Sequence, residues 1–471
     1  MTLDIVILFG YALGLVLIGW FSLRRAHSRE DYLVAGRRLG PVMYAATLST
    51  VVLGGASTVG TVRLGYVYGL SGLWFCALMG LGILVISLFL SRRLVRLNLV
   101  TVTELLQRHY NPATRLSGAV IMIAYALMVA VASIVACGTI LHGLFGLPFW
   151  GGVLLGGGVV VLYAVIGGMW SITLTDIVQF FIMTVGMMFL LAPMSIQNAG
   201  GWDAMRLLLP ESHFSLATLG LPMFLGFTLN YFLGIMIGQD IWQRVFTARS
   251  EKVARFGGAA AAIYCMLYGI CGALIGMAAK VLLPPLADPN TAFAGVVHAT
   301  LPNGIRGIVV AAALAAMMST ASAALMAAST TFAEDVLPRI GGKSTLLADR
   351  ASTLAIGLLA LAFSLALNDV FRPLTIAYDL LVGSILVPIV GAIYWKRGTA
   401  TAAIISMAVS AGVTIFFLVK DGLDANSPIF FGLGSSLLVF FSVSMLGDRH
   451  GTSLCPLERT SRDPRTFSSA R

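Results

Sequence analysis

Long runs of hydrophobic residues recur along the whole chain, separated by short polar segments. A run of about 18 or more residues can cross ~30 Å of hydrocarbon as an α-helix, because a helix rises ~1.5 Å per residue. The pattern predicts an all-α polytopic membrane protein with about thirteen transmembrane helices. They are expected at residues 4–22, 42–63, 71–91, 117–142, 150–168, 171–194, 217–238, 257–282, 304–332, 351–368, 372–395, 399–419 and 428–446. The first run lacks the basic segment of a secretory signal peptide, so we expect it to remain as a spanning helix.

The composition supports a membrane protein and excludes other classes. Of the 471 residues, 58% are hydrophobic and only 11% are charged, whereas a soluble domain carries roughly 25% charged residues. A chain of this length cannot enclose so much apolar surface in water. This excludes a soluble enzyme, a nucleic-acid-binding domain and a disordered chain. The sequence also lacks a phosphate-binding loop of the Walker type and a metal-binding His or Cys motif, so we expect gradient-driven work and no enzymatic activity.

Positive charge gathers on one side of the predicted topology. With the N-terminus outside, most of the 30 Lys and Arg residues fall in cytoplasmic loops or in the C-terminal tail. The exceptions are Arg63, Arg206, Lys280, Arg306, Arg372 and Lys420. This bias follows the positive-inside rule. It predicts a multi-pass protein of the cell (inner) membrane with an external N-terminus and a cytoplasmic C-terminus.

Two weakened helices indicate an internal repeat. Gly54-Gly55, followed by Ser57 and Thr58, interrupts the second predicted helix, and the segment Gly226–Gly234 weakens the seventh. Paired weak helices are typical of transporters built from inverted repeats, in which they mark the binding site. We therefore expect a single transmembrane transporter domain over residues 1–471. Its parts are a peripheral helix at 1–22, five-helix repeats at 42–194 and 217–396, two peripheral helices at 399–446 and a cytoplasmic tail at 447–471.

Polar side chains inside the predicted helices supply the candidate chemistry. An ionisable side chain at the bilayer centre costs about 2.5–3.5 kcal/mol, so Asp176 in the sixth helix requires an explanation. On the ninth helix, Ser319 and Ser322 share a face and Thr320 borders it. Hydroxyls, free carbonyls and a carboxylate suit a hard cation such as sodium. The alternatives are an acid that complements the helix dipole and hydroxyls that bond only to their own backbone.

Several motifs resemble those of the sodium:solute symporter family. The run Gly167-Gly168-x6-Thr175-Asp176-x2-Gln179 is similar to the family signature. Similar segments follow in the family's order at Glu30–Gly40, Ala56–Gly60, Trp242–Arg249 and Leu314–Thr320, the last running on to Glu334-Asp335. The resemblance covers most of the chain. It implies the five-plus-five inverted-repeat fold shared with the bacterial leucine transporter, with helices 2–11 as the core.

The resemblance also implies where sodium binds. Carried over by motif position, the ligands are the carbonyls of Thr50, Leu53 and Ala316 and the hydroxyls of Ser319 and Thr320, with Asp176 close by. Some members of the family hold a further sodium ion with that aspartate and the serines that follow. This chain keeps Ser322 but has Ala323 where a second serine would stand. Sodium is thus the expected transported ion, with one or two ions per cycle.

The solute is expected at the membrane midplane, between the interrupted second helix and helices 3, 7 and 11. The polar candidates there are Ser57, Thr58, Thr228, Asn230, Tyr231 and Tyr378. Sugar-carrying relatives use several Gln, Glu and Lys side chains in this region, and this chain offers few at matching positions. An amino acid, a carboxylate or a vitamin-like solute is therefore favoured. Arg63 and Asp379 are candidates for an external gate or for holding a charged solute, and the alternative for Arg63 is extension to the interface.

Together these patterns predict a secondary active transporter that carries a small organic solute into the cell with sodium by alternating access. The expected partners are the solute, sodium and the lipid bilayer, without nucleic acid. Three other functions stay open: a proton-coupled symporter with Asp176 as the proton carrier, a sodium-independent uniporter, and a transporter-like membrane sensor.

Overall fold

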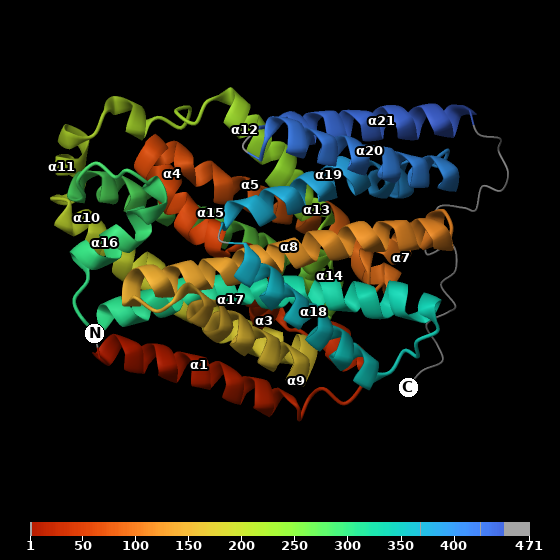
Figure 1. Ribbon diagram of the computed structural model, residues 1–471, viewed down its shortest axis with the longest axis horizontal. Coiled ribbons are helices and arrows are strands. Elements are labelled where there is room, and N and C mark those ends of the chain that lie inside the picture. Colours follow the sequence, from red (N-terminus) through yellow and green to blue (C-terminus); the bar gives the residue numbers. More distant parts are fainter. Residues whose placement is uncertain (1, 368, 424, 447–471) are drawn as a thin grey trace.

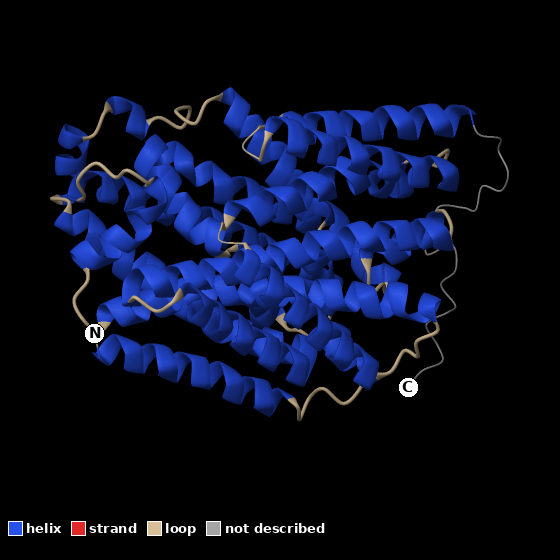
Figure 2. Ribbon diagram, in the orientation of Figure 1, coloured by secondary structure: helices blue, strands red, loops and turns tan. Residues whose placement is uncertain are grey.

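The computed structural model describes residues 2–367, 369–423 and 425–446, so the predicted tail at 447–471 lies outside the described residues. Within them the chain is almost entirely helical (Figure 2). The β-structure of the described part is limited to an isolated bridge between Leu39 and Ala248. The predicted all-α class is confirmed.

Several of the long helices begin after a residue whose side chain caps them. Asn111, Ser250, Thr345 and Thr399 each accept a hydrogen bond from a backbone N–H in the first turn that follows. The α-helices are α1 (Thr2–Ser22), α2 (Arg29–Val34), α3 (Pro41–Val52), α4 (Thr61–Tyr68), α5 (Trp74–Val85), α6 (Ser91–Leu97), α7 (Val102–His109), α8 (Pro112–Phe145), α9 (Phe149–Met183), α10 (Ala192–Asn198), α11 (Gly201–Leu208), α12 (Leu221–Phe227), α13 (Leu233–Ile237), α14 (Gln239–Thr247), α15 (Glu251–Leu282), α16 (Ala292–Thr300), α17 (Ile305–Thr331), α18 (Leu346–Ala366), α19 (Phe371–Tyr394), α20 (Ala400–Asp421) and α21 (Ser427–Leu446). Tighter or wider helical segments are η1 (Ala35–Arg37), η2 (Ala56–Gly60), η3 (Gly69–Leu73), η4 (Ile86–Leu90), η5 (Thr184–Leu191), η6 (Glu211–Phe214), η7 (Thr228–Phe232), η8 (Pro289–Thr291), η9 (Phe332–Val336) and η10 (Leu337–Ile340).

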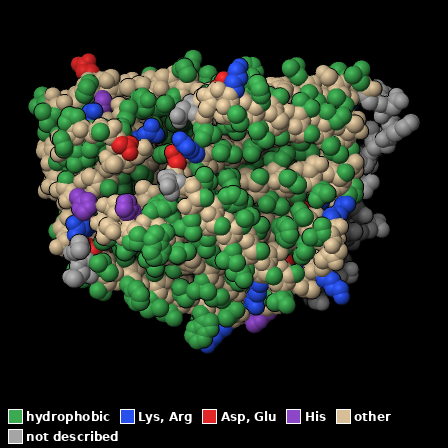
Figure 3. Space-filling view, viewed as in Figure 1, with side chains coloured by type: hydrophobic (Ala, Val, Ile, Leu, Met, Phe, Trp, Pro, Cys, Tyr) green, Lys and Arg blue, Asp and Glu red, His purple; other side chains and the backbone are tan. Residues whose placement is uncertain are grey.

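The long helices run roughly along the longest axis of the molecule, and α17 lies among them (Figure 1). It packs against α8, α9 and α3 and is buried over most of its length. Outside this centre, α1 covers α9, and α20 and α21 pack together against α19. The face in Figure 3 is mostly hydrophobic, and α1 exposes Phe9 and Trp20. Such a surface suits lipid, as expected of a multi-pass membrane protein.

The number of spanning helices differs from the predicted thirteen. By length and composition, ten helices of the described residues can cross a membrane, or eleven when the bent pair Leu221–Ile237 and Gln239–Thr247 is one span. Part of the difference lies in Phe149–Asn198, a continuous stretch of 50 residues. As a straight helix it would be ~75 Å long, more than twice the hydrocarbon thickness. Gly168 breaks it with φ 55° and ψ −137°, a conformation that only glycine adopts readily. Thirteen spans, and the positions of the two repeats, stay predictions.

The predicted interruption of the second helix is confirmed. Helix α3 ends at Val52, Leu53 has φ −89° and ψ 67°, and η2 begins at Ala56. Gly54 lies against α17, where an added Cβ would come within 2.7 Å of the Thr320 hydroxyl oxygen. The glycine therefore allows close contact between the broken helix and α17.

The second weak stretch takes a different form. Residues Thr228–Phe232 form the π-helical segment η7, so the helix widens there and continues into α13. The sharp change comes later, at Gly238, where α13 and α14 meet at 41°. Gly238 has φ −60° and ψ 133°, an extended backbone that ends one helix and precedes the other. The two interrupted helices thus differ in the form of their breaks: the first is interrupted at Leu53 and Gly54, and the second bends at Gly238.

Candidate functional site

The end of α3 and the middle of α17 bring an oxygen-rich group together. The Ser319 hydroxyl lies 3.0 Å from the carbonyl oxygen of Thr50 and 2.9 Å from that of Ala316. The Thr320 hydroxyl lies 2.9 Å from the carbonyl oxygen of Val51 and 3.5 Å from that of Thr50. All of these side chains are buried. Sodium is a hard cation that binds oxygen ligands, and closely spaced hydroxyl and carbonyl oxygens are ligands of this kind.

The break in α3 explains why the carbonyls of Thr50 and Val51 are available. The last four carbonyls of a helix have no partner within it, and α3 ends at Val52. The structure brings Thr50, Ala316, Ser319 and Thr320 together, with Leu53 at the break itself, and their role as sodium ligands stays a prediction. The carbonyl of Val51 was not predicted, although the position of Gly54-Gly55 would have included it. The Ser322 hydroxyl donates to the carbonyl oxygen of Ser319 at 2.9 Å. It therefore bonds to the backbone of its own helix, as hydroxyls in membrane helices often do.

Asp176 links three helices in the interior. It is fully buried on α9. One carboxylate oxygen, Oδ2, accepts a hydrogen bond from Thr47 of α3 and pairs with Arg244 of α14 at 3.5 Å. The other oxygen, Oδ1, has no hydrogen-bond partner among the described residues. Asp176 is thus a buried, paired charge that holds α3, α9 and α14 together.

A small cavity lies beside the oxygen-rich group. Its volume is about 30 Å³, and its polar wall includes Ser57, Ser133, Asp240, Thr320 and Tyr378. A water occupies at least ~10–15 Å³ by this measure, so the space fits one or two waters and must widen to accept a solute. The rest of the lining is glycine and apolar side chains of α3, α5, α8, α13 and α19, together with Val370 just before α19.

The predicted solute-binding residues divide between the cavity and its surroundings. Ser57 and Tyr378 line the cavity. Thr58 instead bonds to the hydroxyl of Tyr268 at 2.9 Å, and Thr228 bonds to a carbonyl of its own helix.

Tyr231 packs edge-on against Tyr378, with ring centres 5.1 Å apart, and Asn230 lies beside Asp379. The prediction missed Ser133 and Asp240. The run Gly238-Gln239-Asp240 was a signal for the second, because it places a polar group at a helix break.

A larger vestibule adjoins the cavity. It measures about 270 Å³ and is lined by residues that include Asp288, Asn290 and Phe371, and it shares Gly55 and Val370 with the cavity. The two volumes are therefore separated by a thin wall.

The two charges of the predicted gate have other neighbours, and only Arg63 contacts a residue that lines the vestibule. The Arg63 guanidinium lies 5.3 Å from the centre of the Phe371 ring, a cation–π arrangement. Asp379 is buried on α19 beside Asn230. In the described part of the chain, no ion pair joins Arg63 to Asp379. The gate stays a prediction.

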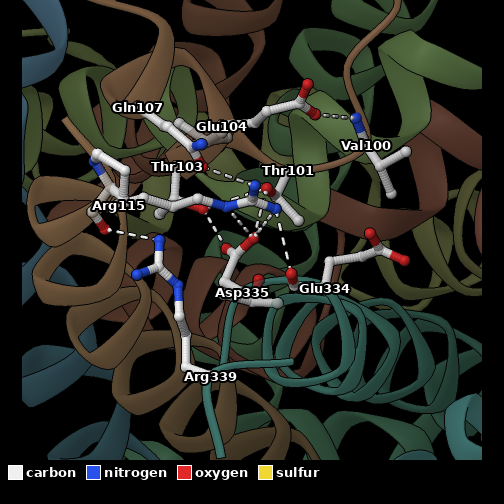
Figure 4. Close-up of polar contacts among 12 residues, drawn as sticks. Val100, Thr101, Thr103, Glu104, Gln107, Arg115, Glu334, Asp335 and Arg339 are labelled. Carbon is white, nitrogen blue, oxygen red and sulfur yellow. Dashed lines mark hydrogen bonds and ion pairs between the residues drawn. The ribbon is translucent and has the colours of Figure 1, made fainter. Parts of the chain in front are cut away.

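The other end of the bundle is closed by ion pairs. Figure 4 shows Arg115 of α8 and the hydroxyls of Thr101 and Thr103 converging on the buried carboxylate of Asp335, with Arg115 at 2.5 Å. We call these four residues the latch. Nearby, Arg29 of α2 bonds to Asp349 of α18 at 2.7 Å and pairs with Glu334. The hydrogen bond with Asp349, opposed in part by burial, and the charge of Glu334 raise the pKa of Arg29 above its ordinary value. The paired charges close the bundle at the end opposite the vestibule.

Comparison with known proteins gives consistent matches over most of the chain. A model of the sodium:solute symporter family matches residues 32–410. The high-affinity proline transporter PutP of Bacillus subtilis (strain 168) is 26% identical over 459 residues, which cover 92% of this chain and 96% of that protein. A sodium/proline symporter of Staphylococcus aureus (strain JH9) is 25% identical over 482 residues, covering 94% and 92%.

Solved structures show the same fold. The substrate-bound, outward-open state of a Na+-coupled sialic acid symporter has a TM-score of 0.83 at 18% identity and covers 96% of this chain and 99% of that one. A nucleobase-cation-symport-1 family transporter in a closed conformation has a TM-score of 0.56 at 15% identity, covering 92% and 98%.

A helical bundle with an interrupted span against a hydroxyl-rich helix defines a membrane transporter of the inverted-repeat class. The family match extends over most of the chain. The chain belongs to the sodium:solute symporter family. The predicted family and fold class are thereby confirmed, with sodium as the co-transported ion.

Proposed function

We propose that this protein imports a small amino-acid-like solute together with sodium by alternating access. The observation that carries the proposal is the contact between the hydroxyls of Ser319 and Thr320 and the carbonyls at the broken end of α3. The names of the proline-transporting relatives support an amino or imino acid. Among its described residues the cavity wall carries no Gln, Glu or Lys side chain of the kind that sugar-carrying relatives use, which favours such a solute over a sugar.

In the proposed mechanism sodium binds between α3 and α17 with the ligands predicted for it, Thr50, Leu53, Ala316, Ser319 and Thr320. An ion held by both helices orders the break at Gly54, which forms part of the cavity wall. Sodium therefore raises the affinity for the solute, and by linkage the solute raises the affinity for sodium. Asp176, paired with Arg244, accepts a hydrogen bond from Thr47 and so holds α3 in position. Ser322 and Asp176 are the proposed ligands of a further ion.

Transport then requires a change at both ends of the bundle. We assign the vestibule to the external side and the latch to the cytoplasmic side, as the positive-inside rule and an external N-terminus require. Solute and sodium enter through the vestibule, the wall at Val370 closes behind them, and the latch opens. The cell then receives both, because the internal sodium concentration is low.

The driving force is adequate for strong accumulation. One charge that crosses about 100 mV supplies ~2.3 kcal/mol. A tenfold sodium gradient adds ~1.4 kcal/mol, so one sodium ion supports roughly several hundredfold accumulation of a neutral solute.

The test uses purified protein in proteoliposomes with sodium on one side, an imposed potential and radiolabelled proline among a panel of amino acids. We expect accumulation only with a sodium gradient, and its loss in Ser319→Ala and Thr320→Ala. Ser364→Ala is the matched control, because that buried hydroxyl bonds to Ala360 of its own helix at 2.7 Å, away from the site. Accumulation driven by a pH gradient without sodium would instead establish proton coupling. Equilibration without accumulation would establish a uniporter. Either result refutes the proposal.

A further inference from the structure

Asp240 places a carboxylate at the wall of the central cavity. It is the one charged side chain among the residues that line this cavity, and it is 3% exposed. Within a membrane an ionisable side chain is costly and usually serves a function. Asp240 is not part of the oxygen-rich group at α3 and α17, because none of the hydrogen bonds in that group involves Asp240.

The local structure holds this carboxylate but leaves its charge without an ion-pair partner. The Tyr125 hydroxyl donates to Oδ1 of Asp240 at 3.1 Å. Arg244 stands one turn further along α14, yet its ion pair is with Asp176 at 3.5 Å. Among the described residues, no Lys, Arg or His forms an ion pair with Asp240. Two buried carboxylates thus lie near one guanidinium that pairs with Asp176, and this leaves excess negative charge at Asp240 beside the cavity.

The alternative interpretation of Asp240 is a structural one. It is the second residue of α14, and an acidic side chain at the start of a helix complements the helix dipole. That position and the Tyr125 hydroxyl explain how the carboxylate is tolerated. They do not explain why it borders the space next to Ser57 and Thr320. A carboxylate on the surface of a solute cavity attracts a positive group on the solute.

Aromatic rings beside Asp240 add to the same preference. The Tyr378 ring lines the cavity and lies edge-on to Tyr125 and Tyr231, with ring centres 5.4 Å and 5.1 Å apart. Aromatic faces attract ammonium groups through the ring quadrupole, most strongly where water is excluded. A carboxylate and an aromatic wall together match an organic cation, whether its nitrogen is primary, secondary or quaternary.

We propose that Asp240 binds the cationic nitrogen of the transported solute and thereby selects ammonium-containing solutes over carbon analogues of the same shape. This inference rests on the proposed function, because it takes the cavity as the solute site. It narrows the solute to zwitterions or organic cations.

The experiment measures binding of matched pairs to the full-length protein in lipid nanodiscs with sodium present. The pairs are alanine and isobutyrate, proline and cyclopentanecarboxylate, and glycine betaine and tert-butylacetate, which differ only in nitrogen against carbon. Affinity is measured by calorimetry on the wild type and on Asp240→Asn, which keeps the shape and removes the charge. Asp203→Asn is the control, because this exposed acid on α11 lies outside the cavity.

We expect at least one nitrogen member to bind at least tenfold more tightly than its carbon partner, both in the wild type and in the control Asp203→Asn. In Asp240→Asn we expect this preference to fall to about one. The inference is overturned if in every pair the carbon member binds as tightly as its partner, if no nitrogen member binds, or if the preference is unchanged in Asp240→Asn. If Asp240→Asn does not fold, the same affinities are measured on Tyr125→Phe. We expect this variant to show a reduced preference for the nitrogen members, and an unchanged preference refutes the assignment. Stabilisation of the wild type by sodium alone is recorded in parallel. Its absence would count against the proposed sodium coupling and not against Asp240.

Discussion

The buried pair of Asp176 and Arg244 should respond asymmetrically to neutralisation. Arg244→Met leaves two buried carboxylates, Asp176 and Asp240, without a guanidinium. Asp176→Asn leaves Arg244 one turn from Asp240, which can take over as its partner. Removing one member of a buried ion pair costs about 3–5 kcal/mol when the remaining charge is uncompensated. A lost hydrogen bond to a charged group costs about 1.5–3 kcal/mol.

We therefore expect Arg244→Met to lower the free energy of unfolding by about 3–5 kcal/mol and Asp176→Asn by about 1.5–3 kcal/mol. The double variant should be no less stable than Arg244→Met, because removing Asp176 removes one of the stranded charges. The assay is reversible unfolding of purified protein in mixed micelles, titrated with denaturing detergent. Equal losses in the two single variants, or losses that add in the double variant, would refute the shared-guanidinium reasoning.

Two further predictions concern the ends of the bundle. For the gate, the charge reversals Arg63→Asp and Asp379→Arg should each reduce uptake, and their combination should restore part of it. A double variant no better than the singles would rule out a pairing during the cycle and leave Arg63 with Phe371. For the latch, Arg115→Met should strand the buried carboxylate of Asp335 and shift the closed-to-open equilibrium about tenfold, or ~1.4 kcal/mol. Labelling of a cysteine introduced at Val102 in a cysteine-free chain should rise accordingly, and unchanged labelling would contradict the role of the latch.

The sequence was most informative where function depends on the backbone. The glycines at 54 and 55 predicted the interruption, and a helix end always leaves carbonyls free. The pairing of Thr50 with Ser319 came instead from the resemblance to the family, through the positions of its motifs. Local patterns also marked the boundary between two apolar runs at Gly168, where the structure breaks the helix although no polar loop separates the runs. In each case the signal lies within a few residues of the feature.

The solute cavity was harder to predict because its lining depends on helix rotation. A helix with hydrophobic residues on all sides gives no indication of which face turns inward. Thr58 and Thr228 therefore seemed as good as Ser57, although the structure turns the first toward Tyr268 and the second toward its own backbone. Asp240 follows a break in the helix, and its direction is set by packing among distant segments.

The wall between the vestibule and the central cavity has a consequence for inhibition. Gly55 and Val370 border both volumes. A compound with one binding group in the vestibule, one in the central cavity and a narrow linker between them would therefore hold this wall open. The tethered second group would bind at high effective concentration. Such a compound would stop the transport cycle before the latch could open. Its potency would depend on the length of the linker more than on either binding group.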